Sequence, residues 1–270
     1  MSSDPLTLVI VGYLAMVLFM AGLWAVQLFT RNASIADVGF CLGLMAVVCW
    51  YATEASGETE RKLVVVLLAC LYAGRLGAFL LVNRVLGKAE DARYQELRRS
   101  WGARERVKMF GYFQLQAAAV SAFSLPFLVV MQHPRPPFGL WELAGVVVWV
   151  AAVSGEATAD WQLARFRSRP WNRGRVCREG LWYCSRHPNY FFEWLHWWGY
   201  VALAVHAPLW WVPLAAVAAM GYFIIRVTGI PPTEAQALRS RGDAYRAYQR
   251  TTSPFVPWPP RAGALPETGR

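Results

Sequence analysis

The stretch Gly180–Gly199, GLWYCSRHPNYFFEWLHWWG, determines how we interpret the rest of the chain. A basic, proline-containing loop leads directly into an aromatic, apolar helix. Arg186, His187 and Asn189 lie where this helix begins, and Glu193 follows one helical turn later. An ionisable residue within a membrane span is costly and by default indicates a functional site. The stretch therefore predicts half of a cofactor site at the cytoplasmic face of a membrane enzyme.

The composition is that of a membrane protein. Of 270 residues, 56% are hydrophobic and 16% are charged, and the mean hydropathy is +0.27. The 14 Trp and 11 Tyr suit aromatic belts at the two membrane interfaces. None of the five Cys forms a CxxC pair, so the sequence supports neither a zinc site nor a disulfide framework, and we predict no metal.

Apolar runs predict an all-α integral membrane protein with about seven transmembrane helices. The first run lacks a basic leader and a cleavage site, so we interpret it as a span. We expect one domain over residues 1–260 and a flexible tail over residues 261–270. The expected spans are Leu6–Phe29, Ile35–Tyr51, Leu63–Val82, Met109–Met131, Leu140–Leu163, Tyr190–Val205 and Leu209–Ile225.

The distribution of Lys and Arg predicts the orientation. Of the 27 basic residues, 23 lie in Asn83–Lys108, Arg165–Arg186, the tail from Arg226, and the turn at Arg31. All of these segments are cytoplasmic if the N-terminus is outside. The net charge of +10 is therefore mostly a matter of topology, and we predict no nucleic-acid partner. We expect a bacterial inner membrane or endoplasmic reticulum location, contacts with membrane lipids, and an active site that faces the cytoplasm.

Charged residues near the expected helix ends allow both structural and functional interpretations. Asp37 either contributes to capping of the second span, for which Ser34 is the better cap, or takes part in catalysis. Arg75 lies about two turns from the basic loop, which favours a bound anion over snorkelling. Glu156 and Asp160 share a helix face and either bind a ligand or pair with neighbouring arginines.

The region around Trp258 also has two interpretations. Consecutive prolines in FVPWPPR exclude a helix there. The segment either docks against the cytoplasmic loops or forms an inert tail.

Together, several motifs resemble the steroid 5-alpha-reductase C-terminal-domain family, and most closely its bacterial branch DUF1295. The resemblance covers Asn32 to Pro260. The motifs are N-x-SIADVGF at 32–40, GKAEDARY at 87–94, E-x-x-x-D-x-Q-L at 156–163, GLWYCSRHPNYFFEW at 180–194, and GIPPTE and YRAYQRTTSPFVPWPP near the end.

The resemblance implies a seven-helix membrane fold that holds NADPH in a cytoplasm-facing pocket. It also implies hydride transfer to a carbon–carbon double bond conjugated to a carbonyl in a lipophilic, steroid-like or unsaturated lipid substrate. By motif, Tyr72 matches a Tyr that contacts the substrate carbonyl, and Asp37 lies near a substrate-side Glu. We therefore predict Tyr72 and Asp37 as catalytic residues. The predicted cofactor-binding residues are Arg75, Glu156, Asp160, Arg167, Arg175, Arg186, His187, Asn189 and Glu193.

Two other functions compete with the reductase. The RHPNY loop also resembles that of isoprenylcysteine and phospholipid methyltransferases, which bind S-adenosylmethionine. Their tail carries paired glutamates, whereas PTEAQAL offers only Glu234, which favours the reductase. A non-catalytic protein that assists lipid handling is the third alternative, although it would not need such costly buried charges. No GxGxxG or Walker loop is present, so arginines and polar helix ends would have to hold a dinucleotide.

Overall fold

The structure, a computed structural model, describes residues 4–133 and 139–261. Throughout these residues every regular element is a helix, and an isolated parallel bridge joins Ser185 to Ser253. The all-α prediction is confirmed. The chain divides into an N-terminal unit (Met1–Gly139 and Ala204–Val212) and a C-terminal unit (Leu140–Leu203 and Pro213–Arg270). The single domain over 1–260 stays a prediction, and all but Arg261 of the expected flexible tail lies outside the described residues.

Six helices of the described chain are long and apolar enough to cross a membrane, which indicates a multi-pass membrane protein. The remaining expected span, Tyr190–Val205, corresponds to α8 (Pro188–Leu203). Its 16 residues reach about 24 Å at 1.5 Å per residue, less than the ~30 Å hydrocarbon core. The orientation across the membrane stays a prediction. The six candidate spans are Pro5–Thr30, Ile35–Glu54, Thr59–Val85, Ala92–Met131, Leu140–Ser168 and Trp211–Thr251.

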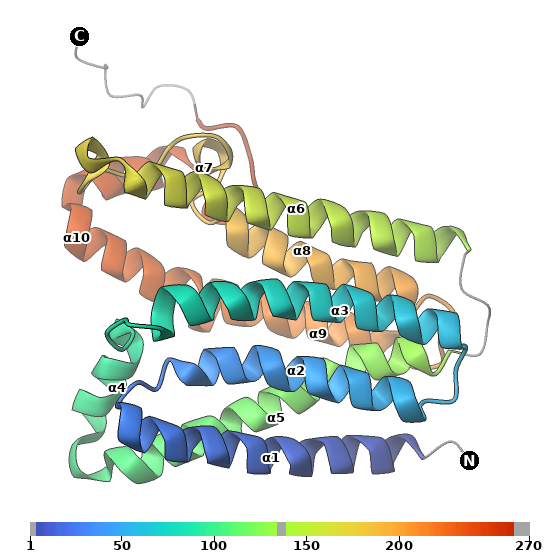
Figure 1. The fold of residues 1–270 in the computed structure, drawn as a ribbon. Coiled ribbons are helices and arrows are strands. Elements are labelled where there is room, and N and C mark those ends of the chain that lie inside the picture. The colour runs from blue at the N-terminus through green and yellow to red at the C-terminus, as the bar shows by residue number, and fades with distance from the viewer. Residues whose placement is uncertain (1–3, 134–138, 262–270) are drawn as a thin grey trace. The chain divides into compact units, whose positions relative to one another are not determined.

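In the N-terminal unit, long apolar helices pack around a core that includes Leu8, Tyr51 and Phe113. The first helix begins at a capping Asp4, whose carboxylate accepts from the Thr7 amide at 3.3 Å. Leu18 and Phe29 remain 74% and 88% exposed, as expected for surfaces that face lipid. The elements are α1 (Pro5–Thr30), α2 (Ile35–Glu54), α3 (Thr59–Leu80), η1 (Leu81–Val85), α4 (Ala92–Trp101), η2 (Gly102–Arg104) and α5 (Glu105–Met131) (Figure 1).

The basic loop between α3 and α5 packs against the turn between α1 and α2. The Ala33 amide donates to Glu90 Oε1 at 2.7 Å, and the Asp91 amide donates to the Ser34 hydroxyl at 3.0 Å. Ser34 occupies the N-cap position of α2 but makes no side-chain cap bond, so the cap predicted from sequence is wrong. The hydroxyl is instead used to hold the loop. Both basic segments of this unit therefore lie at the same end, as the charge distribution predicted.

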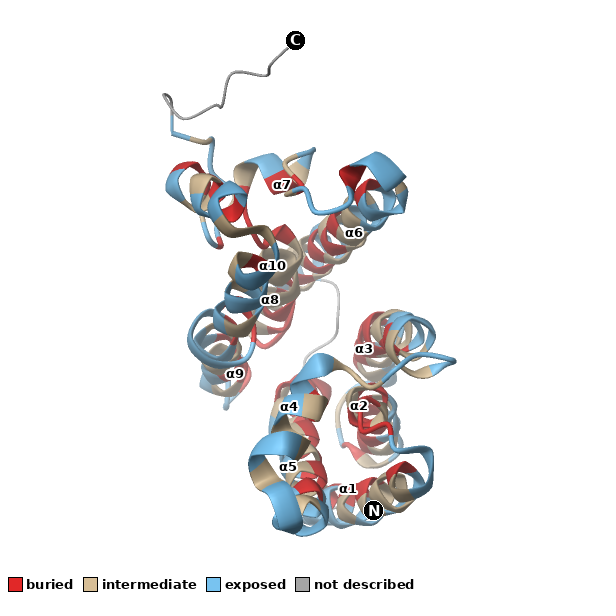
Figure 2. Cartoon of the chain, turned by 90° about the vertical axis from the view of Figure 1, so that its left-hand side faces the viewer, coloured by how far each residue is buried: buried red, intermediate tan, exposed pale blue. Residues whose placement is uncertain are grey.

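The C-terminal unit is built on the long contact between α6 and α8. Buried residues are concentrated along these two helices, whereas α10 leaves one face exposed (Figure 2). A polar α10 after an apolar α9 is consistent with a helix that leaves the membrane. The elements are α6 (Leu140–Ser168), η3 (Pro170–Asn172), α7 (Leu181–Cys184), α8, α9 (Trp211–Tyr222), η4 (Phe223–Val227) and α10 (Ile230–Thr251).

Glycines allow α6 and α8 to approach closely. A Cβ added to Gly145 would lie 2.7 Å from the Gly199 carbonyl oxygen, and one added to Gly199 would lie 2.8 Å from the Gly145 oxygen. A Cβ on Gly155 would meet the Phe192 ring at 2.5 Å. Small residues are the usual means by which membrane helices bring their backbones together. This contact fixes the position of the α8 side chains relative to those of α6.

Candidate functional site

The loop that precedes α8 is anchored to α6. Gln162 Oε1 accepts from the Leu181 amide at 2.9 Å, and the Trp182 indole N–H donates to the Ala159 carbonyl at 2.9 Å. Gly180 adopts φ +58°, and a Cβ there would collide with the Gln162 side chain. Only glycine tolerates both the backbone conformation and this close approach. The start of the 180–199 stretch is therefore held in one conformation on the surface of α6.

Asp160 and Asn189, both predicted cofactor-binding residues, meet across the contact between α6 and α8. Asn189 Nδ2 donates to Asp160 Oδ1 at 3.3 Å. Asn189 Oδ1 is buried and has no hydrogen-bond partner among the described residues. An amide oxygen left without a donor in a buried position is costly, and such an atom calls for an explanation. The arrangement leaves this oxygen available to accept a hydrogen bond from an N–H group of a ligand.

Glu156 and Glu193 extend this polar line along the same two helices. Glu156 lies one turn before Asp160 on α6 and is 4% exposed. Glu193 lies one turn after Asn189 on α8 and is partly buried. The same-face relationships expected from their spacing therefore exist within the C-terminal unit.

Arg186 and His187 instead connect the loop to α10 through Glu234. Arg186 Nε donates to Glu234 Oε1 at 2.6 Å, and Nη1 donates to the Gln249 and Thr252 carbonyls at 3.0 and 2.8 Å. His187 Nε2 lies 3.3 Å from the same carboxylate oxygen. Arg186 and His187 are 8% and 3% exposed. These contacts join the loop to α10, and the predicted role of both residues in cofactor binding stays a prediction.

The segment after α10 docks on the same loop. The Arg186 amide donates to the Ser253 carbonyl at 2.8 Å, and the Trp258 amide donates to the Cys184 carbonyl at 3.0 Å. The Ser185 hydroxyl donates to the Phe255 carbonyl at 2.8 Å. We call residues 252–261 the C-terminal strap. Of the two interpretations of the Trp258 region, docking against the loops is confirmed.

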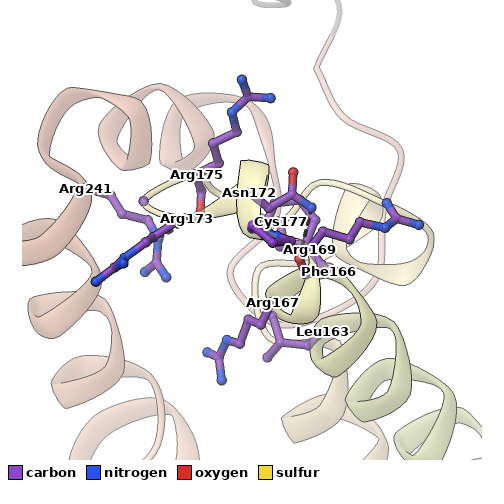
Figure 3. Close-up of a pocket in the computed structure, with 11 residues that line it drawn as sticks. Leu163, Phe166, Arg167, Arg169, Asn172, Arg173, Arg175, Cys177 and Arg241 are labelled. Atoms are coloured by element: carbon purple, nitrogen blue, oxygen red, sulfur yellow. Dashed lines mark hydrogen bonds between the residues drawn. The ribbon is translucent and has the colours of Figure 1, made fainter.

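The loop after α6 and the middle of α10 enclose a basic pocket of about 390 Å³. Arg167 and Arg175, the two arginines predicted to hold a phosphate, both line it. Figure 3 shows Arg167, Arg173 and Arg241 extending toward one side of the loop, while Arg175 extends away from them. The full lining also includes Leu163, Phe166, Arg169, Pro170, Asn172, Gly174 and Cys177. We call this cavity the arginine pocket.

The charge of the arginine pocket is only partly neutralised. Arg169 forms an ion pair with Glu179 at 3.2 Å, and Arg241 Nε donates to the Arg175 carbonyl at 3.0 Å. The guanidinium groups of Arg167, Arg173 and Arg175 have no ion-pair or hydrogen-bond partner within residues 4–133 and 139–261. Burial raises the pKa of the Cys177 thiol, so no thiolate opposes an anion here. The donor set suits phosphate groups.

In the N-terminal unit, Tyr72 and Arg75 lie one turn apart on α3, as predicted. The Arg75 guanidinium carbon lies 5.9 Å from the centre of the Tyr72 ring. Tyr72 is 6% exposed. A cation above an aromatic face favours a fixed ring position. Tyr72 is thus a buried, oriented phenol, and its predicted catalytic role stays a prediction.

Asp37, in the first turn of α2, is the centre of an ion-pair cluster. Its carboxylate accepts from the Tyr94 hydroxyl at 2.6 Å and from Arg93 Nη2 at 2.8 Å. Arg84 Nη1 lies 3.3 Å away. Tyr94 is 1% exposed and lies edge-on to Tyr112 at 5.5 Å. Asp37 lies in the first turn of α2, where a negative charge is favoured, and its carboxylate also organises the GKAEDARY loop.

Four residues that sequence reasoning did not place in a site are central to these clusters. Arg173 and Arg241 line the arginine pocket, Glu234 joins the loop to α10, and Tyr94 holds Asp37. The PTEAQAL motif named Glu234 only as a difference from methyltransferases. Arg241 lies 74 residues after Arg167, so local spacing gave no signal for their proximity. Within the described residues, no group of His, Cys, Asp and Glu is arranged to hold a metal.

The fold and these clusters define a helical multi-pass membrane protein with a basic pocket in its C-terminal unit. Residues 23–252 match the family described as "Protein of unknown function (DUF1295)", and the chain belongs to this family. The DUF1295 branch named from the motifs is therefore confirmed, and the wider resemblance to the steroid 5-alpha-reductase family stays a prediction. No curated protein and no solved structure matches the chain.

Proposed function

We propose that the protein is an integral membrane oxidoreductase that uses NADPH to reduce a carbon–carbon double bond of a lipophilic enone, steroid-like or another unsaturated lipid. The observation that carries this proposal is the arginine pocket, where three guanidinium groups lack a partner among the residues that the structure describes. The positive-inside bias accounts for basic residues in this loop, but it does not require their guanidinium groups to line one pocket. A ligand with several phosphates would explain the cluster.

The residues present fit a pyridine dinucleotide phosphate. Arginines bind phosphate oxygens through paired, charge-assisted hydrogen bonds, and Arg167, Arg173 and Arg241 are the best placed to do so. Asn189 Oδ1 offers an acceptor that an amide N–H would satisfy. When bound, NADPH supplies a hydride. In this scheme the arginines bind the phosphates and Asn189 orients the amide. The nearby carboxylates of Glu179 and Glu234 are paired with Arg169 and Arg186 and so do not compete with the phosphates.

Asp160 supports this role by fixing the Asn189 side chain. Because Asn189 Nδ2 donates to Asp160 Oδ1, the side-chain amide is held with its own Oδ1 directed away from Asp160. The close glycine contacts between α6 and α8 keep this pair in register. Asn189 is the binding group in this scheme, and Asp160 is a positioning residue.

Tyr72 is the proposed proton-bearing group of the N-terminal unit. Reduction of an enone places negative charge on the carbonyl oxygen, and a phenol that donates to this oxygen stabilises the charge. A free Tyr has a pKa of ~10 and therefore keeps its proton at neutral pH. Asp37 was predicted to assist, but its carboxylate is occupied by Arg84, Arg93 and Tyr94. Its role in our proposal is to maintain the structure of this unit.

S-adenosylmethionine fits the arginine pocket less well. It carries no phosphate, and its sulfonium and ammonium cations outnumber its single carboxylate, so a cluster of guanidinium groups suits it less well than a dinucleotide. The glutamate that a methyltransferase tail would offer, Glu234, is bound by Arg186 and His187. These observations favour the reductase over the methyltransferase.

Equilibrium binding to the purified full-length protein in detergent tests the proposal. We expect saturable binding of NADPH and little or no binding of S-adenosylmethionine. Binding of S-adenosylmethionine with no binding of NADPH would favour the methyltransferase function over the reductase function. Binding of neither would contradict both enzyme functions.

A further inference from the structure

The C-terminal strap separates two cavities of opposite character within the C-terminal unit. On one side lies a basic cavity of about 320 Å³, lined by Arg186, Arg250, Arg261 and the strap residues Ser253 and Trp258, among others. On the other side lies an apolar cavity of about 470 Å³. Neither is the arginine pocket, because neither shares any lining residue with it.

The apolar cavity is a groove along one face of α9 and its η4 extension. Leu214, Ala218, Gly221 and Ile225 recur at helical spacing and line it together with two tryptophans of α8. The twelve residues from Leu214 to Ile225 span about 16 Å. One leaflet is half of the ~30 Å hydrocarbon core, or about 15 Å. The groove therefore has the length of an acyl chain in a single leaflet.

The basic cavity adjoins the strap end of this groove. Consecutive residues of the strap line the two cavities, Pro254 the basic one and Phe255 the apolar one. Phe255 packs with Ile224 and Ile230 at the end of α9, which places the strap at that end of the groove. The two sites therefore suit the two ends of one amphiphile.

Two arginines give the basic cavity its net charge. Glu234 neutralises Arg186, with the two side chains joined at 2.6 Å. The side chains of Arg250 and Arg261 have no partner in the described part of the chain, and the Arg261 backbone is fixed by a bond from its amide to the Thr251 carbonyl at 3.0 Å. Trp258 is 69% exposed beside them. Exposed Trp and Arg are typical of a membrane interface.

We propose that the C-terminal strap holds one anionic phospholipid, with its headgroup phosphate at Arg250 and Arg261 and one acyl chain in the α9 groove. Charge complementarity selects an anionic headgroup over a zwitterionic one. The apolar groove requires a lipid and not a free phosphate. This binding site is independent of the proposed reductase activity.

Native mass spectrometry of the purified full-length protein with added phosphatidylglycerol or phosphatidylcholine tests this site. We expect wild type to prefer phosphatidylglycerol. Each basic residue near an anionic lipid surface contributes about 1 kcal/mol, so Arg250→Ala with Arg261→Ala should weaken phosphatidylglycerol binding roughly thirtyfold. Phosphatidylcholine, whose phosphate is offset by its choline cation, should weaken less, so the preference for phosphatidylglycerol should shrink. Arg239→Ala, an exposed arginine of α10 outside both cavities, is the matched control and should change neither.

A second variant tests the groove separately. Ala218 is exposed and lines the groove, so Ala218→Phe should fill it without disturbing the core and should weaken binding of both lipids. Ala215→Phe, at an exposed position of α9 outside the groove, is its control. Equal affinity of wild type for the two lipids would overturn the proposal. A phosphatidylglycerol preference that survives the double arginine substitution, or equal competition by inorganic phosphate alone, would also overturn it.

Discussion

Arg186 Nε donates to Glu234 Oε1 at 2.6 Å, with 9% and 15% of the two side chains exposed, and this ion pair joins the loop before α8 to α10. His187 and Gln249 contact the same carboxylate. Removing one partner of a buried ion pair leaves an uncompensated charge, which typically costs 3–5 kcal/mol. We therefore expect Glu234→Ala to lower the free energy of unfolding by about 3 kcal/mol, measured by thermal unfolding in detergent.

The matched control for Glu234 is Glu179→Ala, which removes a 53% exposed partner of Arg169. Exposed pairs contribute about 0–1 kcal/mol, so this variant should unfold close to wild type. Equal effects of the two substitutions would show that Arg186 and Glu234 do not hold the loop.

The hydrogen bond between Asn189 and Asp160 predicts that exchanging the two residues restores the stability that either single substitution removes. Asn189→Asp places a second carboxylate 3.3 Å from Asp160 Oδ1 and should destabilise the protein. Combining it with Asp160→Asn restores one donor and one acceptor, so stability should return toward wild type. Thermal unfolding of the two single variants and the double variant gives the coupling. Additive effects would mean that the two side chains do not interact.

The same double variant separates structure from cofactor binding. It keeps the hydrogen bond between α6 and α8 but replaces the unpaired Asn189 Oδ1 by a carboxylate oxygen next to a new amide. We expect its stability to recover more completely than its affinity for NADPH. Full recovery of both would indicate that Asn189 serves only to join the helices.

The lowered pKa of Asp91 predicts that the N-terminal unit loses stability in acid. Although burial alone would raise the pKa of Asp91, hydrogen bonds from Arg93 and the charges of Arg93 and Arg84 lower it below its usual value. A lowered folded-state pKa contributes stability that is complete above the unfolded-state pKa of ~3.9 and is lost as pH falls through the folded value. Asp91→Asn should therefore flatten the acid limb of the unfolding free energy measured against pH. An acid limb identical to that of wild type would contradict this assignment.

Tyr72→Phe tests the proposed donor to the substrate carbonyl. The change removes one oxygen and keeps the ring that lies 5.9 Å from the Arg75 guanidinium carbon. Loss of one oxyanion donor lowers turnover by about 10²–10³-fold. NADPH affinity and expression should be unaffected. Wild-type turnover of any enone that the protein reduces would remove Tyr72 from the mechanism.

Much of the fold could be predicted from the sequence because long apolar runs and basic loops follow simple physical rules. Six of the expected runs fall on candidate membrane helices, and the remaining run, Tyr190–Val205, coincides with α8 to within two residues at each end. Asn189 and Asp160 were both predicted as cofactor-binding residues from the family motifs, but their contact across α6 and α8 was not predicted. The partners that the charged side chains find in the folded protein were less predictable.

Arg186, Ser34 and Arg241 show why. Arg186 precedes an apolar helix in the way that a ligand-binding residue does, but its partner Glu234 lies 48 residues later on α10. Ser34 has the correct position for a cap, but the Asp91 amide, 57 residues away, uses its hydroxyl. Arg241 reaches the arginine pocket from another helix. Sequence identifies which side chains need partners, and only the packing of distant helices determines which partners they find.

The most direct test of the central claim is the preference for NADPH over NADH in wild type and in Arg167→Ala with Arg173→Ala, measured by equilibrium binding at low and at high salt. The account predicts that wild type prefers NADPH and that the double variant loses most of this preference, with the larger loss at low salt because salt screens exposed charges. Arg239→Ala should behave as wild type. An undiminished preference for NADPH in the double variant would contradict the account.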